Sequence, residues 1–370
     1  MAENPAFEKI AEGFVSMRQP GTPTAIAGGP RCAVTREKEI ICTFMAQSKL
    51  GINDFKPMLA RSRNGGTTWT EPRLLWPHLE SSSSLFGAVS RAPGGDLFFY
   101  GSIYKIDMPG ESIWSDATQG LKENELFWSR SADNGANWTD PRIIPMPIPG
   151  SAETAMAMCI TRAGRWVCCY SPYPTFDPKI AVDRNQVVAL SSDDQGENWN
   201  HASMLRFADE DSTAAEAWLI ELSDGRLLGT SWHMKPGGDY PNAYALSNDA
   251  GLTWTPTRST DIQGQSTALA ALPDGRALFI YNQRKHGDVG IWLAVVKPTE
   301  TSFGIEANEI VWHAETRTQS GTSGEHVEWR DFSFGEPAVT VLPDASLLIT
   351  WWCVQPSGQG IRFLKMRMKK

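Results

Sequence analysis

The chain has 370 residues, of which 41% are hydrophobic, 21% charged and 10% aromatic, as in ordinary folded globular proteins. This composition excludes a collagen-like, coiled-coil or largely disordered chain. The formal net charge of −8 and the absence of a Lys/Arg block argue against a nucleic-acid partner. The longest apolar runs are strand-sized, which predicts no membrane-spanning helix and no membrane partner.

The first residues and the cysteines bear on the cellular compartment. The opening stretch MAENPAFEKIAEGF carries acids and lacks the apolar core of a signal peptide. We therefore expect a cytoplasmic protein, or a secreted or periplasmic one if a signal peptide has been removed. The six cysteines show no zinc-type CxxC spacing, so we expect buried, reduced thiols. The sequence does not indicate an oligomeric state.

Four segments repeat the pattern Ser-x-Asp/Asn-x-Gly-x-x-Trp. They span residues 62–69, 131–138, 192–199 and 247–254, and their tryptophans are 69, 61 and 55 residues apart. Ser and Asp side chains bind nearby backbone amides, and Gly supplies a positive φ. The pattern predicts a tight turn between two strands that is plugged by the Trp, with a structural and not a catalytic role.

A second repeat reads as a strand, a turn of the Pro-Asp-Gly kind and another strand. Six copies begin near residues 33, 89, 159, 218, 269 and 339. Each copy is a hairpin signal between β-rich runs. Six copies predict an all-β chain folded as a six-bladed β-propeller, with residues 1–370 as a single domain. We expect the segments around Phe14 and Ile361 to pair and close the ring.

The two repeats together resemble the sialidase superfamily of six-bladed propellers, in which the Ser-x-Asp-x-Gly-x-x-Trp turn is known as the Asp-box. The resemblance covers nearly the whole chain and implies a glycoside hydrolase. Because arabinan-cleaving exo-enzymes, lyases and non-enzymatic proteins carry the same turns, the function must be argued from the site.

The site can be located by register, because the innermost strand of each blade begins near the central pocket and residues two apart face the same way. Counting back from each hairpin turn selects one residue per repeat: Arg31, Phe86, Glu153, Glu216, Ser266 and Glu336. Three glutamates and one arginine are thus expected at one axial mouth. Crowding of like charges raises the pKa of one carboxyl group, which yields the acid and the ionised carboxylate that glycoside cleavage needs.

Comparison with the sialidase pattern assigns further roles. Glu216 matches the family Glu that activates the catalytic Tyr, and Glu336 stands where that nucleophilic Tyr is found. Asp54 lies in a loop comparable to the one that carries the acid/base Asp of sialidases. Two arginines of the family triad have no counterpart in this sequence, although Arg284 could supply one cation at the rim. The resemblance therefore implies a sugar other than sialic acid.

Other candidates for substrate binding follow the inner strands. Trp232 is suited to stacking on a sugar ring, and His233 to donating to a hydroxyl or tuning Glu216. Gln265 lies beside the counted position of its blade. We expect no metal and no cofactor, because His233 and His286 lack a third ligand.

The sequence thus predicts an exo-acting glycoside hydrolase that binds a small carbohydrate or oligosaccharide. Glu153 and Glu216, on adjacent blades, resemble the paired glutamates of exo-arabinanases and are the first catalytic pair that we consider. A pair formed by Glu216 and Glu336 is the alternative. Two other functions stay open: a non-catalytic carbohydrate-binding propeller, and a polysaccharide lyase that uses Arg31 or Arg284 to neutralise a uronic acid.

Overall fold

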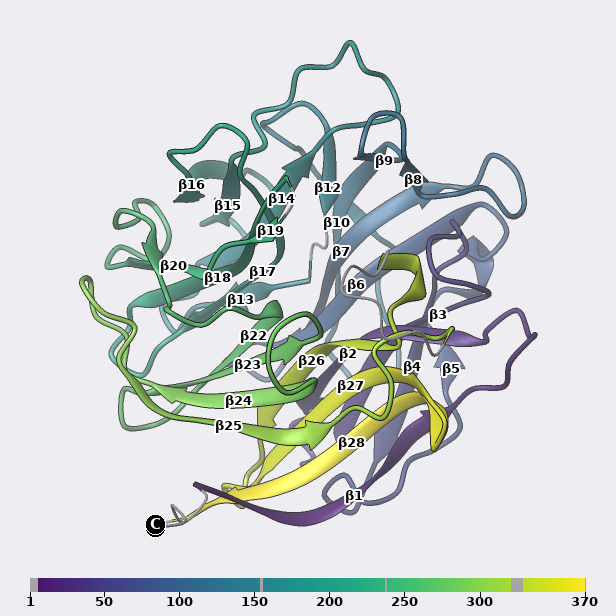
Figure 1. Cartoon of the computed structure of the whole chain (residues 1–370), viewed down its shortest axis with the longest axis vertical. Coiled ribbons are helices and arrows are strands. Elements are labelled where there is room, and N and C mark those ends of the chain that lie inside the picture. The colour runs from purple at the N-terminus through teal and green to yellow at the C-terminus, as the bar shows by residue number, and fades with distance from the viewer. Residues whose placement is uncertain (1–5, 154–155, 237, 321–328, 370) are drawn as a thin grey trace.

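The strands form six antiparallel sheets that follow one another around the molecule (Figure 1). The structure is a computed structural model and describes residues 6–153, 156–236, 238–320 and 329–369. The innermost strands contact one another in a closed ring, in the order β2, β6, β13, β17, β22, β26 and back to β2. The predicted six-bladed β-propeller is therefore confirmed.

Each blade takes its strands largely in chain order from the centre outwards. The first three blades are built as follows: β2 (Ile26–Val34), β3 (Ile40–Gln47), β4 (Lys56–Ser62) and β5 (Arg73–Leu74); β6 (Ser83–Arg91), β7 (Leu97–Lys105), β10 (Asn124–Ser131) and β11 (Arg142–Ile144); β12 (Ser151–Glu153) and β13 (Met158–Ile160), then β14 (Trp166–Tyr173), β15 (Gln186–Ser192) and β16 (Asn200–Arg206). A small hairpin of β8 (Trp114–Ser115) and β9 (Gly120–Leu121) stands in the long loop of the second blade.

The last three blades follow the same plan. They contain β17 (Thr213–Glu221), β18 (Leu227–Lys235), β19 (Gly238–Asp239), β20 (Ala243–Ser247) and β21 (Arg258–Ser259); β22 (Gln265–Ala271), β23 (Ala277–Gln283), β24 (Gly290–Val296) and β25 (Ile305–His313); β26 (Phe334–Val341), β27 (Leu347–Gln355), β28 (Gly358–Met368) and β1 (Phe7–Met17). Two short 3₁₀ segments cover Pro77–Leu79 and Trp329–Asp331, and no described helix is long and apolar enough to cross a bilayer.

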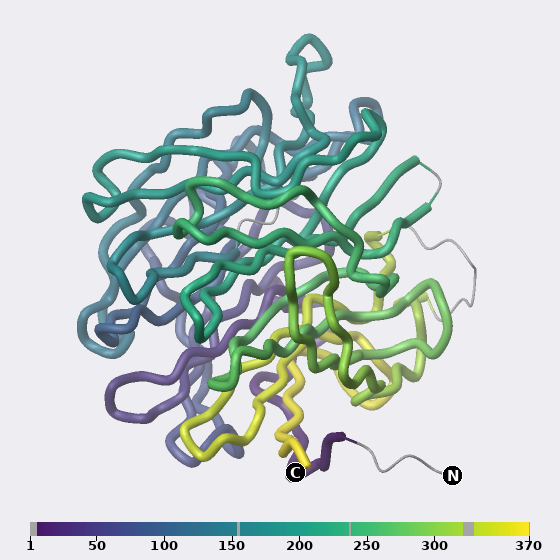
Figure 2. Tube along the Cα trace, turned by 90° about the vertical axis from the view of Figure 1, so that its left-hand side faces the viewer, coloured from purple at the N-terminus to yellow at the C-terminus, as the bar shows by residue number. Residues whose placement is uncertain are grey.

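The ring closes as the sequence predicts. Strand β1 pairs with β28 as the outermost strand of the sixth blade, with Phe14 opposite Arg362 and Ser16 opposite Ile361. The first and last described residues accordingly lie side by side (Figure 2). Phe363 of β28 is buried and packs near Trp69 of the first blade, so this pairing also joins neighbouring blades.

The four Ser-x-Asp/Asn-x-Gly-x-x-Trp segments make nearly identical turns between the third and fourth strands of their blades. In the third blade, Ser192 accepts a hydrogen bond from the Gly196 amide at 2.8 Å, and Asp194 accepts one from the Asn198 amide at 2.9 Å. The Trp199 indole donates back to the Gly196 carbonyl at 3.1 Å. These bonds satisfy the turn from within, as expected for a structural element.

The inner strands carry a bulge where they leave the centre. In four blades the pairing with the second strand shifts here, and the shifted residue is left-handed: Gly29 (φ 56°), Glu216 (51°), Ser266 (47°) and Glu336 (48°). Left-handed backbone costs about 1–2 kcal/mol for a residue with a side chain. Three such residues at equivalent positions mark this end of the propeller as specialised.

Two residues beyond the position of the bulge, the inner strands of five blades form a layer across the axis. Arg31 and Trp218 occupy this layer in the first and fourth blades, and alanines occupy it in three others: Ala88, Ala268 and Ala338. The small alanines leave room for the two large side chains. The Arg31 guanidinium lies 4.5 Å from the centre of the Trp218 ring.

Candidate functional site

A cavity of about 290 Å³ opens where the inner strands begin and the second strands end. Side chains from the inner strands point into it from four blades: Phe86, Glu153, Glu216 and Glu336. Aromatic and apolar residues from second strands and loops form most of the remaining wall, among them Phe55, Tyr104, Trp114, Tyr173, Trp232, Trp329, Phe332 and Trp352. The three counted glutamates thus share one cavity, as the register predicts.

The glutamates are fixed by hydrogen bonds between blades. Glu153 accepts a hydrogen bond from the backbone amide of Glu216, with 2.9 Å from Oε2 to N. Glu336 accepts one from the backbone amide of Gly29 in the same way, at 2.6 Å. In both cases the carboxylate of one blade holds the bulge of the next blade around the ring. A carboxylate that accepts a backbone amide hydrogen bond is held in one orientation.

The pKa of Glu336 differs from that of an ordinary carboxyl group. Burial, followed by the negative charge of Glu216, raises the pKa of Glu336 to about 7, against the lowering effect of Arg31, the Gly29 amide and Arg284. Burial also raises the pKa of Glu216, which Arg284 lowers in turn. One Glu216 oxygen is buried and has no hydrogen-bond partner. At neutral pH, Glu336 therefore holds a proton more readily than an ordinary carboxyl group does.

Arg284 supplies a buried cation to this cavity. Its side chain is only 5% exposed, and its guanidinium lies 3.6 Å from the centre of the Phe332 ring. One nitrogen donates to the Phe334 carbonyl at 3.0 Å, while Nε is buried without a partner. Burial lowers the pKa of Arg284 to about 10, with Glu216 the largest opposing influence. The group is still a cation at neutral pH.

Gln265 holds the backbone that carries this arginine. It is fully buried, and its side-chain oxygen accepts a hydrogen bond from the Arg284 amide at 2.9 Å. It does not line the cavity. Gln265, expected to bind substrate, instead lies behind the cavity wall and supports the backbone of Arg284.

Trp232 faces the cavity and is anchored from behind. Its indole nitrogen donates to Asp239 at 3.2 Å, and Lys285 lies 3.2 Å from the same carboxylate. Asp239 has only 1% of its side chain exposed. The ring is therefore held in one orientation, as a stacking surface for a sugar requires.

Three further predicted residues are not brought to this cavity. His233 points to the other face of β18, between the rings of Phe207 and Tyr240 at 4.0 and 4.5 Å, and burial lowers its pKa to about 4. Asp54 accepts a hydrogen bond from the Ser48 backbone amide at 3.2 Å, and so closes its own loop. Arg31 belongs to the layer beneath, and lines a different cavity with Trp218.

The physical reasons for these differences are local. Successive residues of a strand face opposite ways, so His233 cannot share the face of Trp232. In the first blade the position equivalent to Glu216 is Gly29, because the bulge there falls between Gly28 and Arg31. The expectation that Arg31 joins the glutamates at the axial mouth is corrected accordingly.

Several lining residues were missed because they come from loops without a readable pattern. Trp114 and Trp329 meet edge to face, with ring centres 6.0 Å apart, although they are far apart in the chain. Arg330 joins Asp116 across the same rim at 3.0 Å. Tyr104 is buried, which raises its pKa to about 12. Among the described residues, no group of three or more His, Cys, Asp or Glu side chains could hold a metal ion.

Comparisons with known proteins agree with this architecture. The model of the family described as BNR repeat-like domain matches residues 38–304. A protein of unknown function from Dyadobacter fermentans has a similar structure, with a TM-score of 0.75 and 19% identity over 99% of this chain and 100% of that one. No curated protein matches the sequence.

Two solved structures of enzymes are also similar. The NanB sialidase of Streptococcus pneumoniae has a TM-score of 0.63 and 13% identity, over 96% of this chain and 70% of that one. The α-L-arabinanase of Penicillium chrysogenum, solved with arabinobiose, has a TM-score of 0.62 and 15% identity, over 98% and 99%. At these identities the likeness establishes a shared fold.

Proposed function

This chain belongs to the BNR repeat-like family, and from the cavity at the centre of its propeller we propose that it is a glycoside hydrolase. The reaction would be the removal of a terminal sugar other than sialic acid. The observation that carries the proposal is the pair of partly buried acids, Glu216 and Glu336, which line one aromatic cavity and both have raised pKa values. Such a pair supplies one proton donor and one anion at neutral pH.

Glu336 suits the role of general acid. With a pKa of about 7 it carries a proton near neutral pH and can give it to the glycosidic oxygen as that bond breaks. Glu216 lies beside the Arg284 cation, which favours its ionised form. It would attack the anomeric carbon, or take a proton from the water that does so. This division of roles favours the alternative pair of the sequence analysis.

Glu153 fits a positioning role better than a chemical one. One of its oxygens is committed to the Glu216 amide, and it therefore sets the bulge from which Glu216 projects. The pair of Glu153 and Glu216, the first considered from sequence, would need that oxygen to leave its partner during the reaction. We assign Glu153 to holding Glu216 in place.

The cavity also limits the substrate. Arg284 is the one arginine among the described residues that line it. Recognition of a sialic acid carboxylate in the manner of sialidases uses three arginines, and a single guanidinium offers one fork. The three lining glutamates further oppose an anionic sugar by charge. The aromatic walls suit the apolar faces of a neutral ring.

A screen of aryl glycosides tests the proposal. Aryl arabinofuranoside, rhamnoside, fucoside, glucuronide and sialoside would be offered to the wild type and to the variants Glu216→Gln and Glu336→Gln. We expect release of a neutral sugar that each variant abolishes. Glu221→Gln, which changes a glutamate on the same strand but outside the cavity, is the matched control and should keep full activity.

The two roles can be told apart on the active substrate. If Glu336 is the acid, Glu336→Ala should still cleave a 2,4-dinitrophenyl glycoside, whose leaving group needs no proton, but should lose the alkyl glycoside. Glu216→Ala should lose both substrates. Equal loss of both substrates in both variants would contradict the assignment. No release from any glycoside, in a protein that binds sugars equally well in the glutamine variants, would instead indicate a non-catalytic binding protein.

The lyase alternative finds less support. Arg284 could neutralise a uronic acid, but a base must stand near the substrate. His233 lies outside the cavity, and burial raises the pKa of Tyr104 and Tyr173, which disfavours the phenolate forms. An increase in ultraviolet absorbance without hydrolysis would be the sign of a lyase.

A further inference from the structure

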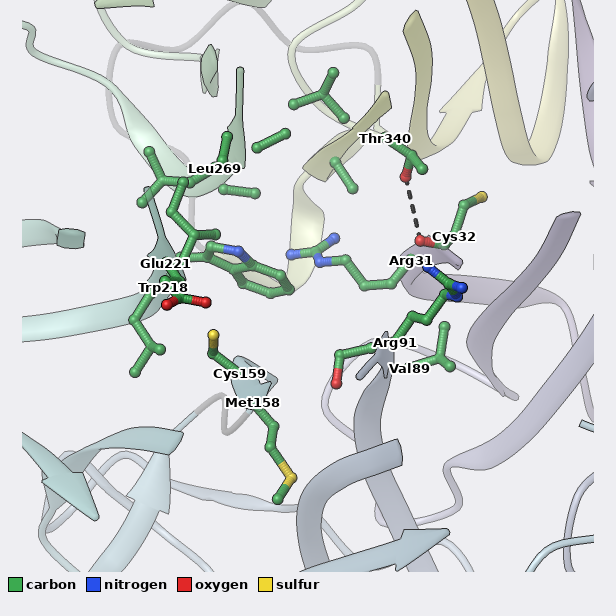
Figure 3. Close-up of a pocket in the computed structure, with 18 of the residues that line it drawn as sticks. Arg31, Cys32, Val89, Arg91, Met158, Cys159, Trp218, Glu221, Leu269 and Thr340 are labelled. Carbon is green, nitrogen blue, oxygen red and sulfur yellow. Dashed lines mark hydrogen bonds between the residues drawn. The ribbon is translucent and has the colours of Figure 1, made fainter. Parts of the chain in front are cut away.

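A second cavity, of about 410 Å³, lies at the opposite end of the inner strands (Figure 3). Its lining comes from the later residues of β2, β6, β13, β17, β22 and β26, whereas the first cavity takes the earlier ones. The layer of Arg31 and Trp218 lines this second cavity and not the first. The two cavities therefore share the propeller axis and lie on either side of this layer.

Arg31 is an unusual group at this position. Its side chain is 4% exposed and forms no ion pair with a described carboxylate, although the charges of Glu336 and Glu216 favour its charged form. One nitrogen donates to the carbonyls of Pro30 and Glu336, at 2.7 and 2.9 Å. The Nε group is buried without a partner. Buried cations in proteins are ordinarily paired, so this guanidinium has an edge left to satisfy.

The other acid in the cavity is already engaged. The Glu221 carboxylate accepts a hydrogen bond from the Arg162 backbone amide at 2.9 Å, and the guanidinium of the same arginine lies 3.3 Å from it. Figure 3 shows the Arg31 side chain directed across the cavity toward Trp218, with Glu221 beyond the ring. Both hydrogen bonds of the Arg31 guanidinium go to backbone carbonyls, so no described carboxylate is hydrogen-bonded to it.

The remaining lining defines the body of a ligand. Polar and apolar surface contribute about equally to it: Val89, Met158, Leu269 and several alanines lie on the strand walls, and Arg91 is a second cation. Ser90 also has a buried hydroxyl without a partner. One free guanidinium edge matches a single negative charge, and its planar fork matches a carboxylate. A phosphate would leave charge unbalanced at this depth.

We propose that this second cavity binds a small organic carboxylate, which the free edge of Arg31 holds while its carbon skeleton lies against Trp218 and the strand walls. The binding is independent of the glycosidase proposal, because it uses a different cavity and is read without turnover. The acid could be a simple aliphatic acid or a sugar acid, and the two sources are distinguished by the probes.

Isothermal titration with sodium propionate, sodium glucuronate and glucose tests the proposal. We expect one site with a millimolar dissociation constant for at least one of the acids, and no binding of glucose that depends on Arg31. Binding of propionate alone would indicate a simple acid, and binding of glucuronate alone a sugar acid. Failure of both acids to bind at tens of millimolar would overturn the proposal.

Variants locate the binding. Arg31→Met should weaken it at least tenfold, whereas Arg91→Met, which changes the other lining cation, should weaken it less. Arg284→Met, which changes the cation of the first cavity, is the control and should leave acid binding in the second cavity unchanged. If Arg31→Met does not fold, Ala270→Phe narrows the cavity from β22 while Arg31 stays in place, and it should also abolish binding. Loss of binding in Arg284→Met, or unchanged binding in Arg31→Met, would refute the assignment.

Discussion

The carboxylate of Glu153 and the backbone amide of Glu216 are joined at 2.9 Å, so one acid of the cavity holds the backbone of another. Glu336 and Gly29 repeat the arrangement on the other side of the ring, at 2.6 Å. In both pairs, the accepting side chain comes from one blade and the left-handed bulge from the next. The acids of the site therefore contribute to its architecture as well as to its charge.

Because of this hydrogen bond, the effect of the Glu153 charge on stability can be separated from the effect of its hydrogen-bonding oxygen. Glu153→Gln keeps an oxygen that can accept the Glu216 amide, so its unfolding free energy should stay close to that of the wild type. Glu153→Ala leaves the amide without an acceptor and should cost about 1–3 kcal/mol. Urea denaturation of the two variants checks the difference. Equal stability of the two variants would show that the hydrogen bond contributes nothing.

The raised pKa of Glu336 predicts that the folded protein loses stability as pH rises. Its pKa in the folded protein is about 7, above the ordinary value of 4.5, so the folded state binds a proton that the unfolded state releases between these values. Stability should therefore be fully present below about pH 4.5 and fall as pH approaches 7, by at most about 3 kcal/mol. Glu336→Gln should remove this part of the pH dependence. Parallel curves for wild type and variant in denaturation at pH 5 and pH 8 would refute the prediction.

Arg31, in the layer beneath the first cavity, should influence the reaction through the pKa of Glu336. Its positive charge lowers the pKa of Glu336, and Glu336 must be protonated to act as an acid. The alkaline limb of kcat/KM should therefore lie near pH 7 in the wild type and move to higher pH in Arg31→Met. The pH profile on the active aryl glycoside measures this shift. A limb that stays in place, or moves to lower pH, would mean that the charge of Arg31 does not reach the acid.

The repeated turns should matter for stability and not for catalysis. Gly196 has a φ of 86°, and a Cβ there would lie 3.0 Å from atoms of Trp128 and Trp166. Gly196→Ala should cost at least about 1 kcal/mol and leave kcat unchanged. Gly94→Ala is the matched control, because that glycine needs no left-handed backbone and has open space around it. Thermal unfolding should separate the two variants, and equal midpoints would contradict the argument.

The sequence was informative wherever a repeat supplied a register. The hairpin spacing selects Glu153, Glu216 and Glu336, which line one cavity, because each blade repeats the same geometry. It fails at Arg31, where matching the face alone selects a residue two positions beyond Gly29 and therefore one layer too deep. Residues two apart face the same way but lie at different depths along the strand, so the face alone does not fix the layer.

The rest of the site could not be read from the sequence, because it depends on contacts between loops. Trp114 and Trp329 meet over the cavity only when the second and sixth blades are brought together by the closed ring. Asp54 offers the opposite case: its neighbours Gly51 and Phe55 line the cavity, while its own carboxylate turns back to Ser48. Nothing in its local sequence distinguishes the two orientations.

The left-handed bulges have a consequence for how such a protein can change over time. Backbone strain at Glu216 and Glu336, together with the burial of two neighbouring acids, works against folding. Replacement of Glu216 by glycine, which Gly29 already exemplifies in the first blade, relieves the strain and removes an acid, whereas Glu336 also holds the Gly29 amide. A lineage released from selection for activity would thus find more stable sequences close at hand, and inert propellers should arise readily from active ones.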